Sequence, residues 1–195
     1  ISNKLDEYIG KALSMMRPTI LYTHKKIEKI EKGCLMLEDN IMFKSARLSS
    51  TLKKCDRTTV FLATIGKEID EKIQALMTQK KITEAYVFDA IGSAAVEGVV
   101  ENFQRKFDTS AMAERETSTL RFSPGYCDWQ VQEQKKLFSV LDNSIIGVDL
   151  SQSCLMTPRK SVSGVFGIGN IESISKSSNP CRLCNMKHCI ARRID

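Results

Sequence analysis

The sequence contains no apolar run long enough to cross a bilayer, which takes about 20 mostly apolar residues. It also contains no stretch that resembles a secretory signal peptide, in which an apolar run follows a basic start. These two absences argue against a membrane protein and against a secreted protein. We therefore expect a cytoplasmic protein that does not bind membranes.

The sequence also lacks a dense basic block and a paired cysteine framework. The net charge is +6 over 195 residues, and the Lys and Arg residues are spread over several segments. Because nucleic-acid-binding proteins concentrate basic residues on one face, we expect no nucleic-acid partner. The number of cysteines is odd, at 7, which is not typical of a secreted disulfide-rich fold.

Both helical and strand patterns are present, in no regular alternation. With 42% hydrophobic residues, the chain is long enough for one domain with a substantial core. Because βαβ alternation is missing, we predict an α+β domain with a largely antiparallel, twisted sheet flanked by helices. Helices are expected over residues 5–16, 42–54, 69–77, 83–107 and 131–141, with a helical turn around residues 27–30. Extended segments are expected over residues 19–23, 34–37, 58–64, 145–148, 149–155 and 161–168, and a polar loop over residues 108–117.

The helix expected over residues 83–107 carries an apolar arc and acidic residues. Asp89 lies near the edge of the arc, whereas Glu97 falls on the opposite, polar side. Gly92 and Gly98 make the middle of this helix thin, so another element can approach it closely. The arc itself, at about 100° per residue, consists of Phe88, Ile91, Ala95, Val99 and Phe103.

The most informative stretch is Leu-Arg-Phe-Ser-Pro-Gly-Tyr-Cys-Asp-Trp, residues 120–129, which holds the only tryptophan. Its first residues alternate as at the end of a strand, and Pro-Gly then predicts a turn in which the glycine is free to take a positive φ. The planar fork of Arg121 could hold a carboxylate, and the ring of Tyr126 could lie along a ligand. The alternative is a surface turn with a salt-bridged Arg121 and packed aromatic residues.

Four motifs in this chain resemble those of one family. Arg-Phe-Ser-Pro-Gly-Tyr, residues 121–126, resembles the Arg-x-x-x-Gly-Tyr motif of the activation domain of cobalamin-dependent methionine synthase. Pro-Arg-Lys-Ser-Val-Ser-Gly follows at residues 158–164, and Ala-Thr-Ile-Gly precedes it at residues 63–66. The fourth motif runs from Asp89 to Glu97. Each motif alone is weak evidence, but all four stand in the family's order and span most of the chain.

The resemblance implies that the chain binds S-adenosylmethionine and helps to reactivate a cobalamin that has fallen to an oxidised state. In the family, the cobalt gains one electron and then takes the methyl group of S-adenosylmethionine, so the protein's role is proximity and orientation. The chain contains no Asp-x-His-x-x-Gly loop for cobalamin. The cobalamin is therefore expected on a partner, either methionine synthase modules or another corrinoid protein. A mildly basic surface would also suit a flavodoxin-like electron donor.

The resemblance assigns the cofactor-binding residues to the stretch at residues 121–126. Arg121, Gly125 and Tyr126 match the family motif position by position. Arg121 is expected to bind the ligand carboxylate, Gly125 to permit close approach, and Tyr126 to contact the ligand with its ring. Backbone groups around Ser123 and Pro124 are expected to bind the edges of the adenine.

The acidic partner of the ligand ammonium is assigned less directly. Asp89 is the candidate, because it lies beside an apolar arc; the alternative is a helix-surface residue or a structural ion pair. Glu97 ranks behind Asp89 because it lies on the polar side. Residues 161–164 either support the cofactor site, or face the corrin, or form a tightly packed strand.

The end of the chain carries a second motif, Cys-x2-Cys-x4-Cys, formed by Cys181, Cys184 and Cys189. Structural zinc has four ligands and an iron–sulfur cluster usually has four cysteines, so this segment is one ligand short. His188, an upstream cysteine or an outside ligand would complete it. The alternative is a set of reduced thiols without metal.

These motifs divide the chain into an S-adenosylmethionine-binding domain over residues 1–170 and a Ser-rich linker with a Cys-rich tail over residues 171–195. An alternative function, from another class, is a non-catalytic redox or adapter protein that acts through this tail. We expect His24 on the surface. The other four cysteines are expected in or near the core: Cys34, Cys55, Cys127 and Cys154.

Overall fold

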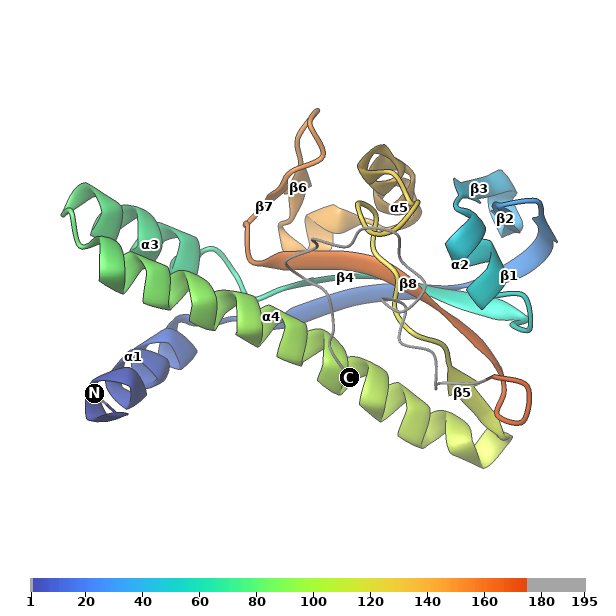
Figure 1. The fold of residues 1–195 in the computed structure, drawn as a ribbon, viewed down its shortest axis with the longest axis horizontal. Coiled ribbons are helices and arrows are strands. Elements are labelled where there is room, and N and C mark those ends of the chain that lie inside the picture. The colour runs from blue at the N-terminus through green and yellow to red at the C-terminus, as the bar shows by residue number, and fades with distance from the viewer. Residues whose placement is uncertain (1, 175–195) are drawn as a thin grey trace.

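The computed structural model describes residues 2–174, and at their centre lies an antiparallel sheet with the strand order β3-β2-β1-β4-β8-β5 (Figure 1). The predicted α+β fold with a largely antiparallel sheet is therefore confirmed. A separate hairpin pairs β6 (Asp149–Leu150) with β7 (Met156–Thr157). The strands of the central sheet are β1 (Thr19–Glu31), β2 (Cys34–Leu37), β3 (Ile41–Lys44), β4 (Arg57–Thr64), β5 (Glu116–Ser118) and β8 (Ser161–Asn170).

β4 lies in the interior of the sheet and is buried on both faces, which explains its uninterrupted apolar run. Val60 and Leu62 belong to the core cluster on one face, whereas Phe61 and Ala63 belong to the cluster on the other. Successive side chains of a strand point to opposite faces, so such a run is stable only where both faces are covered.

Helices provide that cover. The longest, α4 (Ile82–Ala111, 30 residues), crosses one face of the sheet and extends past it to pack with α1 (Ser2–Met15) and α3 (Glu68–Thr78) (Figure 1). The shorter α2 (Ala46–Thr51) and α5 (Gln134–Val140) contribute Leu48 and Leu137 to the cluster on the other face. Within residues 2–174, no helix is both long and apolar enough to span a membrane.

Two predictions near the start of the chain were wrong. Residues 27–30 are not a helical turn but the continuation of β1, because Ile27 and Ile30 pack against the apolar cluster beneath the β1–β2 hairpin. Residues 42–54 are not one helix. They divide at Ser45 into β3 and α2, because the Ser45 hydroxyl accepts the Leu48 N–H at 3.0 Å and so begins a new helix there.

Two later predictions also need correction. Most of the polar loop expected over residues 108–117 is regular secondary structure, since α4 continues to Ala111 and β5 begins at Glu116. Residues 145–148 are not extended. The first two end a 3-10 helix, η4 (Asn143–Ile146), and the Asn143 side-chain amide donates to the Val148 carbonyl at 2.7 Å. Of residues 149–155, only the first two form a strand.

The buried stripe of α4 is displaced around the helix from the predicted arc. Its fully buried members recur every four residues as Phe88, Gly92, Val96 and Val100, while Ile91, Ala95 and Val99 are only partly buried. The displacement turns the Asp89 side of the helix toward the sheet. Close approach occurs at Gly92, where a Cβ atom would lie 3.0 Å from Ile69 Cγ2 and 3.2 Å from the Lys160 side chain.

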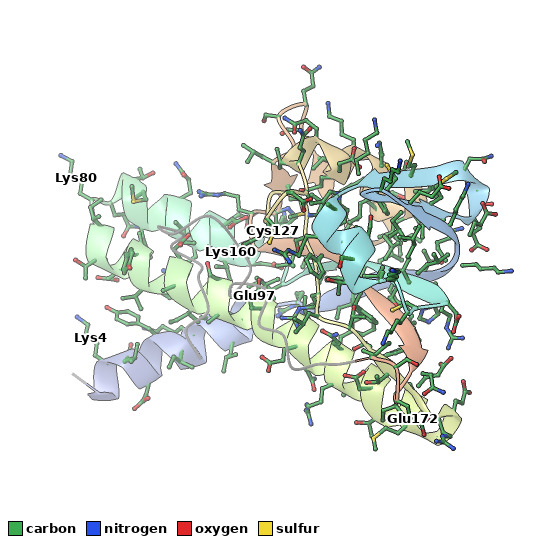
Figure 2. The ribbon with its side chains drawn as sticks, turned by 45° about the vertical axis from the view of Figure 1, so that its right-hand side comes forward. Lys4, Lys80, Glu97, Cys127, Lys160 and Glu172 are labelled. Carbon is green, nitrogen blue, oxygen red and sulfur yellow. The ribbon has the colours of Figure 1, made fainter. Side chains whose placement is uncertain are left out.

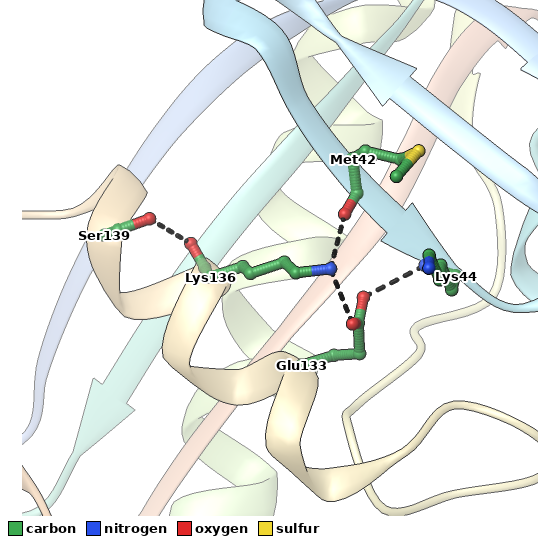
Figure 3. A network of polar contacts seen from close by, with 5 residues as sticks. All are labelled: Met42, Lys44, Glu133, Lys136 and Ser139. Atoms are coloured by element: carbon green, nitrogen blue, oxygen red, sulfur yellow. Dashed lines mark hydrogen bonds and ion pairs between the residues drawn. The ribbon is translucent and has the colours of Figure 1, made fainter.

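The edge strand β3 is bound by two charged side chains from the segment that starts α5. Lys136 Nζ donates to the Met42 carbonyl at 3.0 Å and forms an ion pair with Glu133 at 2.6 Å (Figure 3). The second carboxylate oxygen of Glu133 accepts the Lys44 N–H at 3.0 Å. Main-chain groups at this edge therefore have partners, although within residues 2–174 no strand lies beyond it.

Candidate functional site

The stretch at residues 121–126 forms the predicted strand end and turn. Phe122 exchanges two main-chain hydrogen bonds with Val165 of β8, both at 2.8 Å. The chain then turns through Ser123, Pro124 and Gly125, and the Tyr126 N–H donates to the Ser123 carbonyl at 3.2 Å. Gly125 takes a φ of +93°, as predicted for a turn with proline followed by glycine. The turn leaves Gly125 and Tyr126 at the surface.

Arg121 lies between this turn and helix α4. Its side chain is only 18% exposed, and its Nη2 forms a loose ion pair with Glu97 Oε2 at 3.5 Å. Its Nη1 donates to Gln104 Oε1 at 3.2 Å. The guanidinium is therefore held against α4, beside the Glu97 carboxylate, which is 55% exposed.

Gln104 is a residue that the sequence analysis missed. Its Nε2 donates to the Ser118 hydroxyl and to the Thr119 carbonyl, both at 2.7 Å, while its Oε1 accepts from Arg121. All three contacts join α4 to the segment that follows it in the chain, from β5 to the start of the turn. Only its place on the polar side of α4, seven residues after Glu97, could have indicated it.

Asp89, the predicted acidic partner, is engaged elsewhere. Its carboxylate accepts from Lys160 Nζ at 2.7 Å, and the same ammonium donates to the Ser93 hydroxyl at 2.9 Å. The Lys160 side chain is 8% exposed. Asp89 and Glu97 are eight residues apart in one helix, which is about 12 Å along its axis. The structure thus pairs Glu97, and not Asp89, with Arg121.

The motif at residues 161–164 lies directly beneath the turn. Ser161 and Ser163 are buried, and Ser161 bonds to the Thr64 hydroxyl at 3.0 Å. A Cβ atom at Gly164 would lie 2.5 Å from the Phe122 carbonyl oxygen and 3.0 Å from Ser123 Oγ. The motif is therefore a tightly packed strand, and its glycine lets the turn lie close to β8.

Both charge pairs of α4 and the exposed turn come from the middle of the chain's extent as seen in Figure 2. Figure 2 places Glu97, Lys160 and Cys127 there, between the helical end marked by Lys4 and Lys80 and the opposite end marked by Glu172. Pro124 is buried, whereas Gly125 next to it is exposed. Tyr126 is 53% exposed, which leaves its ring available for contact.

The cysteines and histidine of the described residues add no metal site. Cys55 and Cys154 are buried and Cys34 is half-buried, as expected, but Cys127 is exposed in the loop, so its predicted place near the core is wrong. Burial, and then the neighbouring Asp56, raises the pKa of Cys55 to about 12. Among residues 2–174, no three His, Cys, Asp or Glu side chains form a group that could hold a metal ion. The predicted metal ligands Cys181, Cys184 and Cys189 lie outside this range.

Comparison with known proteins identifies a family and solved structures of similar fold. A family model described as vitamin B12 dependent methionine synthase, activation domain, matches residues 14–173. The crystal structure of the MetH reactivation domain bound to AdoHcy superposes with a TM-score of 0.64 at 16% identity, over 85% of this chain. The chain spans 65% of the length of that solved structure, and the likeness at this identity concerns the fold. No curated protein matches the sequence.

Proposed function

The chain belongs to the family of the vitamin B12-dependent methionine synthase activation domain, and from this premise we propose that it binds S-adenosylmethionine at the Arg121 turn. There it presents the methyl group for reductive re-methylation of an oxidised corrinoid. The observation that carries the proposal is the meeting of the exposed turn at Gly125 and Tyr126 with the Arg121–Glu97 pair. The solved relative of the same fold holds AdoHcy, a ligand of the same chemical class.

The charges of this pair match those of an amino-acid moiety. Arg121 offers a planar fork to a carboxylate, and Gln104 holds the guanidinium in place. Glu97 offers its carboxylate to an ammonium. At 3.5 Å and with Glu97 55% exposed, the pair is open enough for a ligand that carries both charges to bind across it. Glu97 therefore replaces Asp89 as the proposed partner of the ammonium.

The turn supplies the remaining contacts. The positive φ of Gly125 exposes its main chain, and no Cβ blocks the approach of an adenosyl group. Main-chain groups around Ser123 and Pro124 face the adenine edges, and the exposed ring of Tyr126 covers one side of the ligand. When bound, S-adenosylmethionine supplies an electrophilic methyl group; the residues of this chain bind and orient it.

The corrinoid belongs to a partner in this proposal, either methionine synthase modules or a related corrinoid protein, with a flavodoxin-like protein as the electron donor. The competing function, a redox or adapter protein that acts through the Cys-rich tail, is not favoured, because the family match covers residues 14–173 and so ends before the tail.

Calorimetric titration with S-adenosylmethionine tests the binding site. Arg121→Ala is expected to weaken binding by about 1.5–3 kcal/mol, the scale of a hydrogen bond to a charged group. The matched control is Arg105→Ala, since Arg105 lies on α4 and bonds only locally, to Asn102 at 2.8 Å. Equal affinity of the folded Arg121→Ala protein and the control would remove Arg121 from the site.

Methyl transfer tests the chemistry. The chain alone is expected to bind S-adenosylmethionine without turning it over, because the nucleophile is a cobalt on the partner. Transfer is expected only after addition of a corrinoid protein and a low-potential electron source. Methyl transfer by the chain alone to a thiol would instead identify an ordinary methyltransferase.

A further inference from the structure

The proposed binding turn is fixed to the rest of the fold at two ends. On its first side, Phe122 exchanges two main-chain hydrogen bonds with Val165. On its second side, Asp128 and Trp129 attach it to β3 and α2. Gly125 and Tyr126 lie between these attachments and are exposed. Their conformation therefore depends on both ends.

Asp128 makes the most extensive polar contact of the second attachment. Its Oδ1 accepts the Ser45 hydroxyl at 2.6 Å and its Oδ2 accepts the Ala46 N–H at 2.6 Å. The Arg47 N–H lies 3.2 Å from Oδ2 and 3.3 Å from Oδ1. One carboxylate thus caps the first turn of α2 from a position more than 80 residues later in the chain.

The electrostatics agree with this geometry. Burial alone raises the pKa of the Asp128 carboxyl, but the hydrogen bonds from Ser45, Arg47 and Ala46 outweigh burial, and the pKa is lowered. The charged carboxylate is the form that these donors hold. A neutral side chain at this position would accept fewer of the same bonds.

Trp129 transmits the attachment to the turn. Its ring is 1% exposed and packs edge-on against Phe43, with ring centroids 5.2 Å apart. The main-chain carbonyl of Trp129 accepts the Gly125 N–H at 2.7 Å, and its main-chain N–H donates to the Tyr126 carbonyl at 3.0 Å. The main chain at Gly125 and Tyr126 is therefore bonded directly to the residue that follows Asp128.

We propose that Asp128 is a positioning residue for the binding site: by holding the start of α2, it fixes Trp129 and, through it, the conformation of Gly125 and Tyr126 that receives S-adenosylmethionine. The inference rests on the proposed function. It assigns Asp128 no contact with the ligand. The sheet does not depend on this contact, because Phe122 is already paired with β8 independently.

The test compares Asp128→Asn with a control that makes the same chemical change at another long-range contact. Asp70→Asn is that control, since the Asp70 carboxylate accepts the Arg159 N–H at 2.5 Å but does not touch the turn. We expect Asp128→Asn to weaken S-adenosylmethionine binding about tenfold and Asp70→Asn to leave it within about twofold. Ser45→Ala keeps the carboxylate and removes one donor, so a loss of about threefold is expected.

The single tryptophan gives a second readout that does not need the ligand. Because Trp129 is buried beside Asp128, a loosened turn in Asp128→Asn should shift its fluorescence emission to the red, and saturating S-adenosylmethionine should reverse the shift. Affinity within twofold of wild type in both Asp128→Asn and Ser45→Ala overturns the proposal. If the wild type itself fails to bind, the proposed function fails, and unchanged Trp129 emission in Asp128→Asn would then overturn the positioning role as well.

Discussion

Helix α4 carries two pairs of opposite charge about two turns apart, and the pairs differ in the burial of the cation and in the length of the contact. Asp89 contacts Lys160 at 2.7 Å, and the lysine is 8% exposed and also bonded to Ser93. Glu97 lies 3.5 Å from Arg121, whose side chain is 18% exposed, and the carboxylates of Asp89 and Glu97 are 42% and 55% exposed. The first pair is closed around a buried ammonium, whereas the second is open in its looser contact and is the pair proposed to bind the ligand.

The difference follows from what lies beneath each turn of the helix. At Gly92, α4 approaches the sheet so closely that a Cβ atom there would lie 3.2 Å from the Lys160 side chain. The ammonium is then buried and must be paired. At Glu97, the helix faces Arg121 at the edge of the turn, where solvent reaches the carboxylate. The two pairs are thus distinguished by the burial of the cation and the length of the contact, since both carboxylates are partly exposed.

Breaking the closed pair should have the largest effect on stability. Asp89→Ala leaves the buried ammonium of Lys160 without its carboxylate, and we expect the free energy of unfolding in urea to fall by about 3 kcal/mol. Binding of S-adenosylmethionine should stay within about twofold of wild type. The control is Glu101→Ala, an exposed position on the same helix, with an expected change of about 0.5 kcal/mol or less. A large loss of affinity with normal stability would return Asp89 to the ligand site.

Changing the open pair should have the reverse effect. Glu97→Gln is expected to weaken binding by about 1.5 kcal/mol, because the ligand ammonium loses a charged partner. The free energy of unfolding should change by less than about 1 kcal/mol, as for other exposed ion pairs. Titration calorimetry and urea unfolding measure the two quantities, with Glu101→Gln as the control. Unchanged affinity would show that Glu97 does not contact the ammonium.

Replacing both members of the closed pair sharpens the comparison. In Asp89→Asn with Lys160→Met, neither partner is left as an unpaired buried charge. We therefore expect this double variant to lie within about 1 kcal/mol of wild type, more stable than Asp89→Ala alone. Urea unfolding of the single and double variants provides the cycle. If the double variant is as unstable as Asp89→Ala, the loss arises from packing and not from charge.

The smallest effect on the domain is expected from the tail cysteines. Changing Cys181, Cys184 and Cys189 together to serine should alter binding and stability by less than about 0.5 kcal/mol. We expect anaerobically purified wild type to contain zinc or iron by mass spectrometry, and the triple variant to have lost it. Absence of metal from the wild type would leave the tail as a set of reduced thiols.

Local patterns predicted much of the fold. The apolar run of β4, the amphipathic α1 and α3, and the Pro-Gly turn were all found where expected, because each depends on residues that are neighbours in the sequence. Residues 27–30 were predicted to form a helical turn because Ile27 and Ile30 are three residues apart among charged residues, a spacing that hides the alternation of apolar and polar residues in β1. The division of residues 42–54 at Ser45 rests on the local cap of the Leu48 N–H by the Ser45 hydroxyl and also on Asp128, which binds the start of α2 from more than 80 residues away and lies outside any local pattern.

The site was predicted less completely than the fold. Arg121, Gly125 and Tyr126 form one short motif and could be identified together, although their ligand contacts stay predictions. The ion-pair partners of the two carboxylates, Lys160 for Asp89 and Arg121 for Glu97, could not be identified, since they depend on the rotation of α4 about its axis. Helical periodicity placed Glu97 on the polar side, which is correct, but the polar side is also the side that faces Arg121.

The side chains that bind the edge of β3 limit how this protein can meet other chains. With Glu133 on the Lys44 N–H and Lys136 on the Met42 carbonyl, an incoming peptide finds its hydrogen-bonding partners already taken (Figure 3). Growth of the sheet by strand addition at this edge, whether by a partner or by fibril formation, must first displace these two side chains from the β3 main chain. The two side chains are also paired with each other at 2.6 Å. Complexes formed by this domain are therefore expected to use surfaces other than the β3 edge.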